Sequence, residues 1–95
     1  MIEIKRLSDA DPMRFEVVVR EDSGLSRHEV TLAKNTCEHL TGNRHMPERC
    51  LEAAFLFLLD REPKESILSR FDVTVISRYF PEFEREIPQY LLRVG

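Results

Sequence analysis

The chain contains no tryptophan, only two cysteines and only three glycines among its 95 residues. Because glycine occurs at positions 24, 42 and 95 alone, the sequence has neither a GxGxxG nor a GxxxxGK motif. Phosphate binding by a glycine-rich loop of these types is therefore excluded. No apolar run approaches the roughly 20 residues that a membrane-spanning helix needs. We therefore expect no membrane partner.

The sequence also lacks an excess of charge. Its formal net charge is -3, and neither half of the chain is basic. Nucleic-acid binding draws much of its affinity from a concentrated positive face, so this balance argues against a nucleic-acid partner. The first residues, MIEIKRL, lack the apolar stretch of an export signal. We expect a cytoplasmic protein in which Cys37 and Cys50 are free thiols.

Alternating apolar residues dominate the first third of the chain. In RFEVVVRE, Phe15, Val17 and Val19 share one side of a strand, and the alternation resumes after a turn predicted at residues 22–24. The predicted strands cover residues 1–7, 14–21 and 25–32. A three-stranded sheet with one apolar face needs a cover, and the rest of the chain must supply it.

Residues 33–88 are predicted to form three to five helices. Gly42 is placed to end the first, and Pro47 to begin a central helix that is apolar nearly all round. Helical turns are predicted over 64–71, and Asp72 is predicted to cap a helix over 73–80. Pro88 is expected to end the helical region. The apolar residues expected to cover the sheet are Leu51, Ala54, Phe55, Leu58, Ile67, Leu68, Phe71, Ile76 and Phe80.

The sequence therefore predicts a single small α+β domain over residues 1–95. It consists of a three-stranded antiparallel meander (strands within 1–32), helices on one face of that meander (33–88) and a short tail (89–95). A chain of this length has a thin core, so most of its strongly apolar side chains are needed for folding.

Four potential zinc ligands, Cys37, His39, His45 and Cys50, lie within one short segment. The spacing is not that of a common structural zinc site, and two residues that are two positions apart on a helix point about 200° apart. Structural thiols and solvated histidines are therefore the favoured interpretation. A small enzyme or zinc-binding protein remains an alternative, including a cysteine nucleophile activated by His28, His39 or His45.

The segment PKESILSRFDVTVISRYFP admits a third interpretation, a helix-turn-helix that binds nucleic acid. Arg70 and Arg78 would have to face the phosphates together with Lys64. Three acidic residues lie among them, Glu65, Asp72 and Glu82, and the linking SRFD has no turn glycine. The charges weaken this alternative.

The central helix is apolar on more faces than one small sheet can cover. This leaves a surplus of apolar residues as the candidate partner surface: Phe57, Tyr79, Phe83, Tyr90 and Leu91. The favoured hypothesis is a protein-interaction or regulatory module that uses this C-terminal helical, aromatic surface, either for self-association as a homodimer or for a different protein partner. We predict no catalytic residue, metal or cofactor.

One long phrase in the chain, FLFLLDREPKESILSRFDVTVISRYFPEFE (residues 55–84), resembles the signature of a family of short uncharacterised bacterial proteins. The resemblance covers about a third of the chain. It implies a bacterial cytoplasmic protein with a distinctive C-terminal helical segment, and it implies no activity, ligand or site residue.

Overall fold

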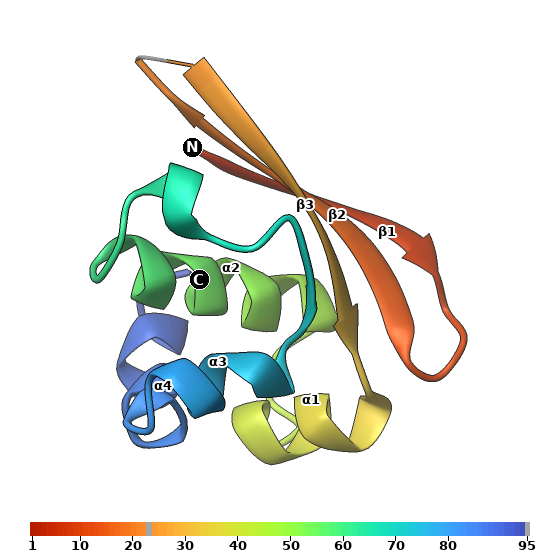
Figure 1. The fold of residues 1–95 in the computed structure, drawn as a ribbon. Helices are drawn as coiled ribbons and strands as arrows, with labels where there is room; N and C mark the ends of the chain where they lie inside the picture. Colours follow the sequence, from red (N-terminus) through yellow and green to blue (C-terminus); the bar gives the residue numbers. More distant parts are fainter. Residues whose placement is uncertain (23, 95) are drawn as a thin grey trace.

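Four strands form one mixed sheet in the computed structural model, which describes residues 1–22 and 24–94 (Figure 1). The order is β1-β2-β3-β4. The first three strands pair antiparallel, and β4 pairs parallel with β3. In chain order the elements are β1 (Ile2–Ser8), β2 (Met13–Glu21), β3 (Gly24–Leu32), α1 (Lys34–Thr41), α2 (Pro47–Leu59), the 3-10 turn η1 (Lys64–Ser66), β4 (Arg70–Asp72), α3 (Thr74–Tyr79) and α4 (Phe83–Leu91).

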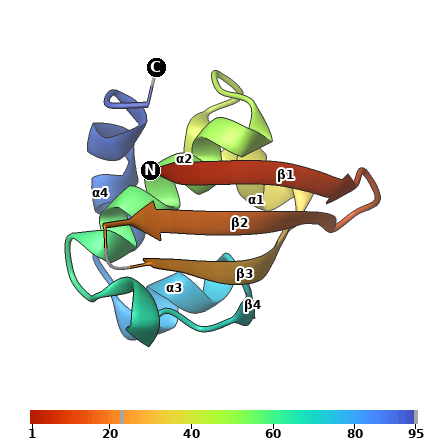
Figure 2. The ribbon, with the colours of Figure 1, turned by 90° about the horizontal axis from the view of Figure 1, so that it is seen from above.

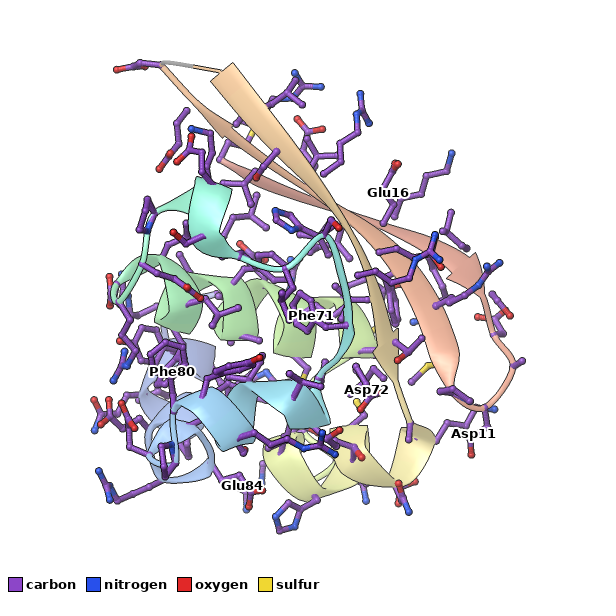
Figure 3. All side chains as sticks on the ribbon, viewed as in Figure 1. Asp11, Glu16, Phe71, Asp72, Phe80 and Glu84 are labelled. Atoms are coloured by element: carbon purple, nitrogen blue, oxygen red, sulfur yellow. The ribbon has the colours of Figure 1, made fainter. Side chains whose placement is uncertain are left out.

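The alternation in the first three strands predicts their faces correctly. Phe15, Val17 and Val19 are buried against the helices, which all lie on one side of the sheet (Figure 2). Glu16 points away from the helices into solvent (Figure 3). The meander is thereby confirmed, and the turn predicted at residues 22–24 includes Ser23, which lies outside the described residues.

The segment after Pro63 differs from the prediction. Only Lys64–Ser66 forms a helical turn, after which the chain extends and adds β4 to the edge of β3. The amide of Glu29 donates to the carbonyl oxygen of Ser69 at 2.8 Å, and the amide of Val73 donates to the carbonyl oxygen of Thr31 at 3.0 Å. Pairing with an otherwise open sheet edge has outweighed the helical pattern.

This strand also removes the helix-turn-helix alternative, because the first of its two helices does not form. Lys64 is buried in ion pairs with Glu65 at 2.6 Å and Glu21 at 3.3 Å, so it is not available to phosphate. Asp72 is the last residue of β4 and the N-cap of α3 is Val73, so Asp72 is not the cap itself; its carboxylate nevertheless accepts hydrogen bonds from the amide and hydroxyl of Thr74, the first residue of α3.

The central helix α2 is buried on two opposite sides. Phe55 faces the sheet, where its ring lies 5.3 Å from that of His28. Phe57, two residues later and therefore about 200° around the helix, packs at 5.0 Å from Phe83 and 5.6 Å from Tyr90 of α4. Figure 1 shows α2 between the sheet and the C-terminal helices. The apolar surplus of α2 is thus covered within the chain.

α4 runs through Pro88, where the sequence predicts an end, and so it takes in part of the predicted tail. A proline inside a helix removes one hydrogen bond and costs about 3 kcal/mol. Ile87, Tyr90 and Leu91 are buried on the side that faces α2, and each buried side chain of this size contributes about 1.5 to 3 kcal/mol. The free energy gained by this packing therefore exceeds the cost of Pro88.

No helix in the described part of the chain has the length and apolar character needed to cross a membrane.

Arg61 joins the end of α2 to the start of α4. Its guanidinium donates to Glu82 at 3.0 Å and to Glu86 at 2.7 Å, and it lies 3.6 Å from the centre of the Phe57 ring. It also donates to the hydroxyl of Tyr90 at 3.3 Å. These bonds raise the pKa of Arg61 although its burial opposes the rise, so the group stays charged. One cation thus holds two helices in register.

We expect Arg61→Ala to lower the free energy of unfolding by about 2–3 kcal/mol, because two carboxylates at the α4 terminus lose their shared partner. Urea denaturation followed by circular dichroism measures this loss. The control is Arg49→Ala, which removes an exposed pair with Glu52 on the same helix and should cost less than about 1 kcal/mol. Equal effects of the two substitutions would contradict the role of Arg61.

Candidate functional site

The predicted partner surface does not exist as a surface. Phe57, Phe83, Tyr90 and Leu91 are all buried, and only Tyr79 is exposed, at 67%. The prediction is wrong for the four because it counted only the sheet as cover for α2, whereas α4 folds back and supplies a second cover.

Tyr79 instead borders an apolar hollow of about 190 Å³ between α2, the segment from η1 to β4, and α3. We call it the α2–α3 groove. Leu68 also lines the groove and is 47% exposed, although the sequence predicts it inward. Phe71 and Phe80, which are labelled in Figure 3, belong to its lining. The groove is lined by Leu58, Glu62, Ser66, Ile67, Leu68, Phe71, Val75, Ile76, Tyr79 and Phe80.

Glu62 is the one carboxylate in this lining. Its burial raises the pKa of the side chain, and within residues 1–22 and 24–94 it takes part in no ion pair. A carboxylate that is partly desolvated and unpaired is stabilised by an incoming cation. The groove therefore combines apolar walls with one acidic group at its edge.

His28 fixes the rim of the groove that carries Leu68. Its Nδ1 lies 2.8 Å from the carbonyl oxygen of Leu68, and its Nε2 lies 2.8 Å from the hydroxyl of Ser26. A carbonyl only accepts, so Nδ1 carries the proton and the Ser26 hydroxyl can donate to Nε2. The ring itself is buried. The alternation places His28 on the inner side of β3, but the sequence does not indicate its partner, 40 positions away.

We expect His28→Phe to lower the free energy of unfolding by about 1–3 kcal/mol and to speed backbone exchange at the Leu68 rim. Phenylalanine keeps a ring beside Phe55 but leaves the Leu68 carbonyl without its donor. Chemical denaturation and amide hydrogen exchange give the two readouts. His39→Phe is the control, because His39 is exposed and its one hydrogen bond in the described part of the chain is with Glu84, at 3.1 Å. A change at His39 as large as that at His28 would contradict this account.

The four candidate zinc ligands do not converge. The thiols of Cys37 in α1 and Cys50 in α2 are neighbours, whereas His39 turns to Glu84 of α4 and His45 lies in the loop between α1 and α2. In the described residues no group of three or more His, Cys, Asp or Glu side chains is arranged to hold a metal ion. The helix geometry that separates Cys37 from His39 is as the sequence predicts.

The two cysteines are free and buried, with Cys37 exposed by 7% and Cys50 not at all. The hydrogen bond from Cys50 lowers the pKa of the Cys37 thiol to about 7, although burial acts in the opposite direction. The same contact, together with burial, raises the pKa of Cys50. The neighbour that tunes Cys37 is thus the other cysteine, not one of the histidines considered from the sequence.

Cys37 should accordingly react with a small alkylating reagent with a pH midpoint near 7. In Cys50→Ala the midpoint should rise toward that of an ordinary cysteine, because the thiolate loses its hydrogen-bond donor. Rates of alkylation by iodoacetamide across pH, read by mass spectrometry, measure both midpoints, with Cys37→Ala as the blank. An unchanged midpoint in Cys50→Ala would refute the coupling.

Comparison of the chain with protein-family models, with curated proteins and with solved structures found no match. The resemblance of residues 55–84 to a bacterial family is therefore still a prediction, and the function rests on the geometry above.

Proposed function

We propose that this chain is a small cytoplasmic protein-interaction module whose α2–α3 groove binds a partner segment that presents an apolar side chain next to a lysine or arginine. The observation that carries the proposal is the groove itself. Leu68 of the segment before β4 and Tyr79 of α3 are both exposed and both line one apolar hollow. The free state of both cysteines agrees with a reducing compartment.

The size of the groove favours a side chain over a small-molecule substrate. Its volume of about 190 Å³ is below the roughly 300 to 1,000 Å³ of typical small-molecule sites. Its lining is mostly apolar, and Glu62 and the Tyr79 hydroxyl are the titratable groups in it. An apolar pocket with aromatic side chains in its lining and one partly buried charge instead resembles an anchor site in a protein interface.

The acidic edge selects the chemistry of the partner. A basic group beside the apolar anchor would pair with Glu62 in a partly desolvated position, where a charge-assisted hydrogen bond is strong. An acidic partner segment would be repelled at the same place. The predicted module therefore discriminates by charge as well as by shape.

A photo-crosslinking amino acid at position 79 tests the proposal in the native cell. We expect one specific protein to be linked, through a segment that contains an apolar residue beside a lysine or arginine. The same probe at position 92 is the control, since Leu92 is 86% exposed but lies outside the groove.

Substitutions then test the contacts with the purified partner. Tyr79→Glu and Leu68→Glu should each weaken binding at least about tenfold, Glu62→Lys should weaken it more than Glu62→Gln, and Leu92→Glu should leave it unchanged. A partner that binds the Tyr79→Glu and Leu68→Glu chains as well as the unmodified one would refute the groove. A linked segment without a basic residue would refute the role of Glu62.

A further inference from the structure

β1 lies at the open edge of the sheet, on the far side from β4 and α3 (Figure 2). It pairs with β2 from Ile2 to Ser8, and no other strand in residues 1–22 and 24–94 pairs with its second edge. A free edge of this length presents a row of backbone donors and acceptors that another strand can use. The opposite edge is different, because β4 is only three residues long.

The residues with outward-facing backbone groups follow from the pairing with β2. The amide of Arg20 donates to the carbonyl of Met1 at 2.8 Å, and the amino group of Met1 donates to the carbonyl of Arg20 at 2.8 Å. Because hydrogen-bonded pairs alternate along an antiparallel ladder, Glu3 and Lys5 also bond β2. The amides and carbonyls of the residues between them therefore face outward; these are Ile2, Ile4 and Arg6.

Charge complementarity then identifies the occupant of this edge. A second copy of β1, antiparallel and centred on Ile4, places Glu3 directly opposite Lys5 twice, once on each side of the two-fold axis. These would be non-hydrogen-bonded pairs, in which side chains approach most closely. Lys5 supports this arrangement, since it has no ion-pair partner among the described residues, while Glu3 is paired only with the exposed Arg20.

Other registers are less favourable. Centring on Glu3 or on Lys5 would place two like charges directly opposite each other, and centring on Arg6 would place two arginines opposite each other. Centring on Ile2 would leave most of the strand unpaired. The Ile4 register also places two apolar side chains at its centre, beside Met46, which is 63% exposed and lies in the same hollow as Ile2 and Ile4.

We propose that two copies of this chain associate through β1, antiparallel and centred on Ile4, so that their two four-stranded sheets become one continuous sheet. The contact is isologous, so it closes with two copies and leaves no β1 edge open for further addition. The proposal is independent of the groove, and each could hold without the other.

Sedimentation of the full chain at increasing micromolar concentrations, combined with a charge exchange, tests the interface. The unmodified chain should form a dimer. Glu3→Lys or Lys5→Glu alone should raise the dissociation constant by about tenfold, because each creates like-charge pairs across the axis. The double variant Glu3→Lys with Lys5→Glu should regain most of the affinity. Tyr79→Glu, in the groove, should leave the dimer unchanged.

Amide exchange by nuclear magnetic resonance gives a second readout that does not require a variant. The amides of Ile4 and Arg6 should become protected as the concentration rises, whereas those of Glu3 and Lys5 should be protected throughout by β2. Circular dichroism of each variant confirms that it is folded. A strictly monomeric chain, a dimer indifferent to the charge exchange, or unprotected Ile4 and Arg6 amides in the dimer would each overturn the proposal.

Discussion

The fold depends on one constraint, that α2 carries large apolar side chains on opposite sides. Phe55 and Phe57 are two residues apart, so a helix must direct them to different neighbours. The sheet can receive only one of them. The other requires a second apolar layer, and α4 supplies it with Phe83 and Tyr90. The protein therefore places its central helix between two covers.

That placement accounts for the course of the remaining chain. After α2 the backbone returns to the sheet, adds β4 beside β3, and then crosses back through α3 so that α4 can reach the far side of α2. Arg61, just after α2, forms ion pairs with Glu82 and Glu86 at the start of α4 and so connects the two helices. The α2–α3 groove lies between α2, the segment from η1 to β4 that leads to the sheet, and α3, which leads away from it.

The elements that follow from local pattern are the ones the sequence predicts well. Alternation identifies three strands and their inner faces, and Gly42 and Pro47 mark the end of α1 and the start of α2. Long-range pairing is what the pattern does not contain. β4 exists because β3 has a free edge, α4 passes Pro88 because α2 packs against its inner side, and both facts depend on segments distant in sequence.

The prediction of the partner surface was wrong for the same reason. Counting apolar residues shows that some remain after the sheet is covered, but it does not show where they lie. Four of the five predicted surface residues fill the second layer, and Tyr79 alone remains outside. Leu68 shows the opposite error. A helix over residues 64–71 would bury its side chain, whereas the extended backbone of the structure exposes it. A pattern of residues shows how much apolar surface a chain must bury, and only the topology shows which part stays open.

The hydrogen bond from His28 to Leu68 has a mechanical consequence for the groove. This bond attaches the Leu68 side of the groove to β3 of the sheet, whereas Tyr79 belongs to α3 in the helical layer. A ligand that contacts both sides would therefore bridge the two layers of the protein. Its binding would resist their sliding past each other, and a displacement of the layers would change the width of the groove.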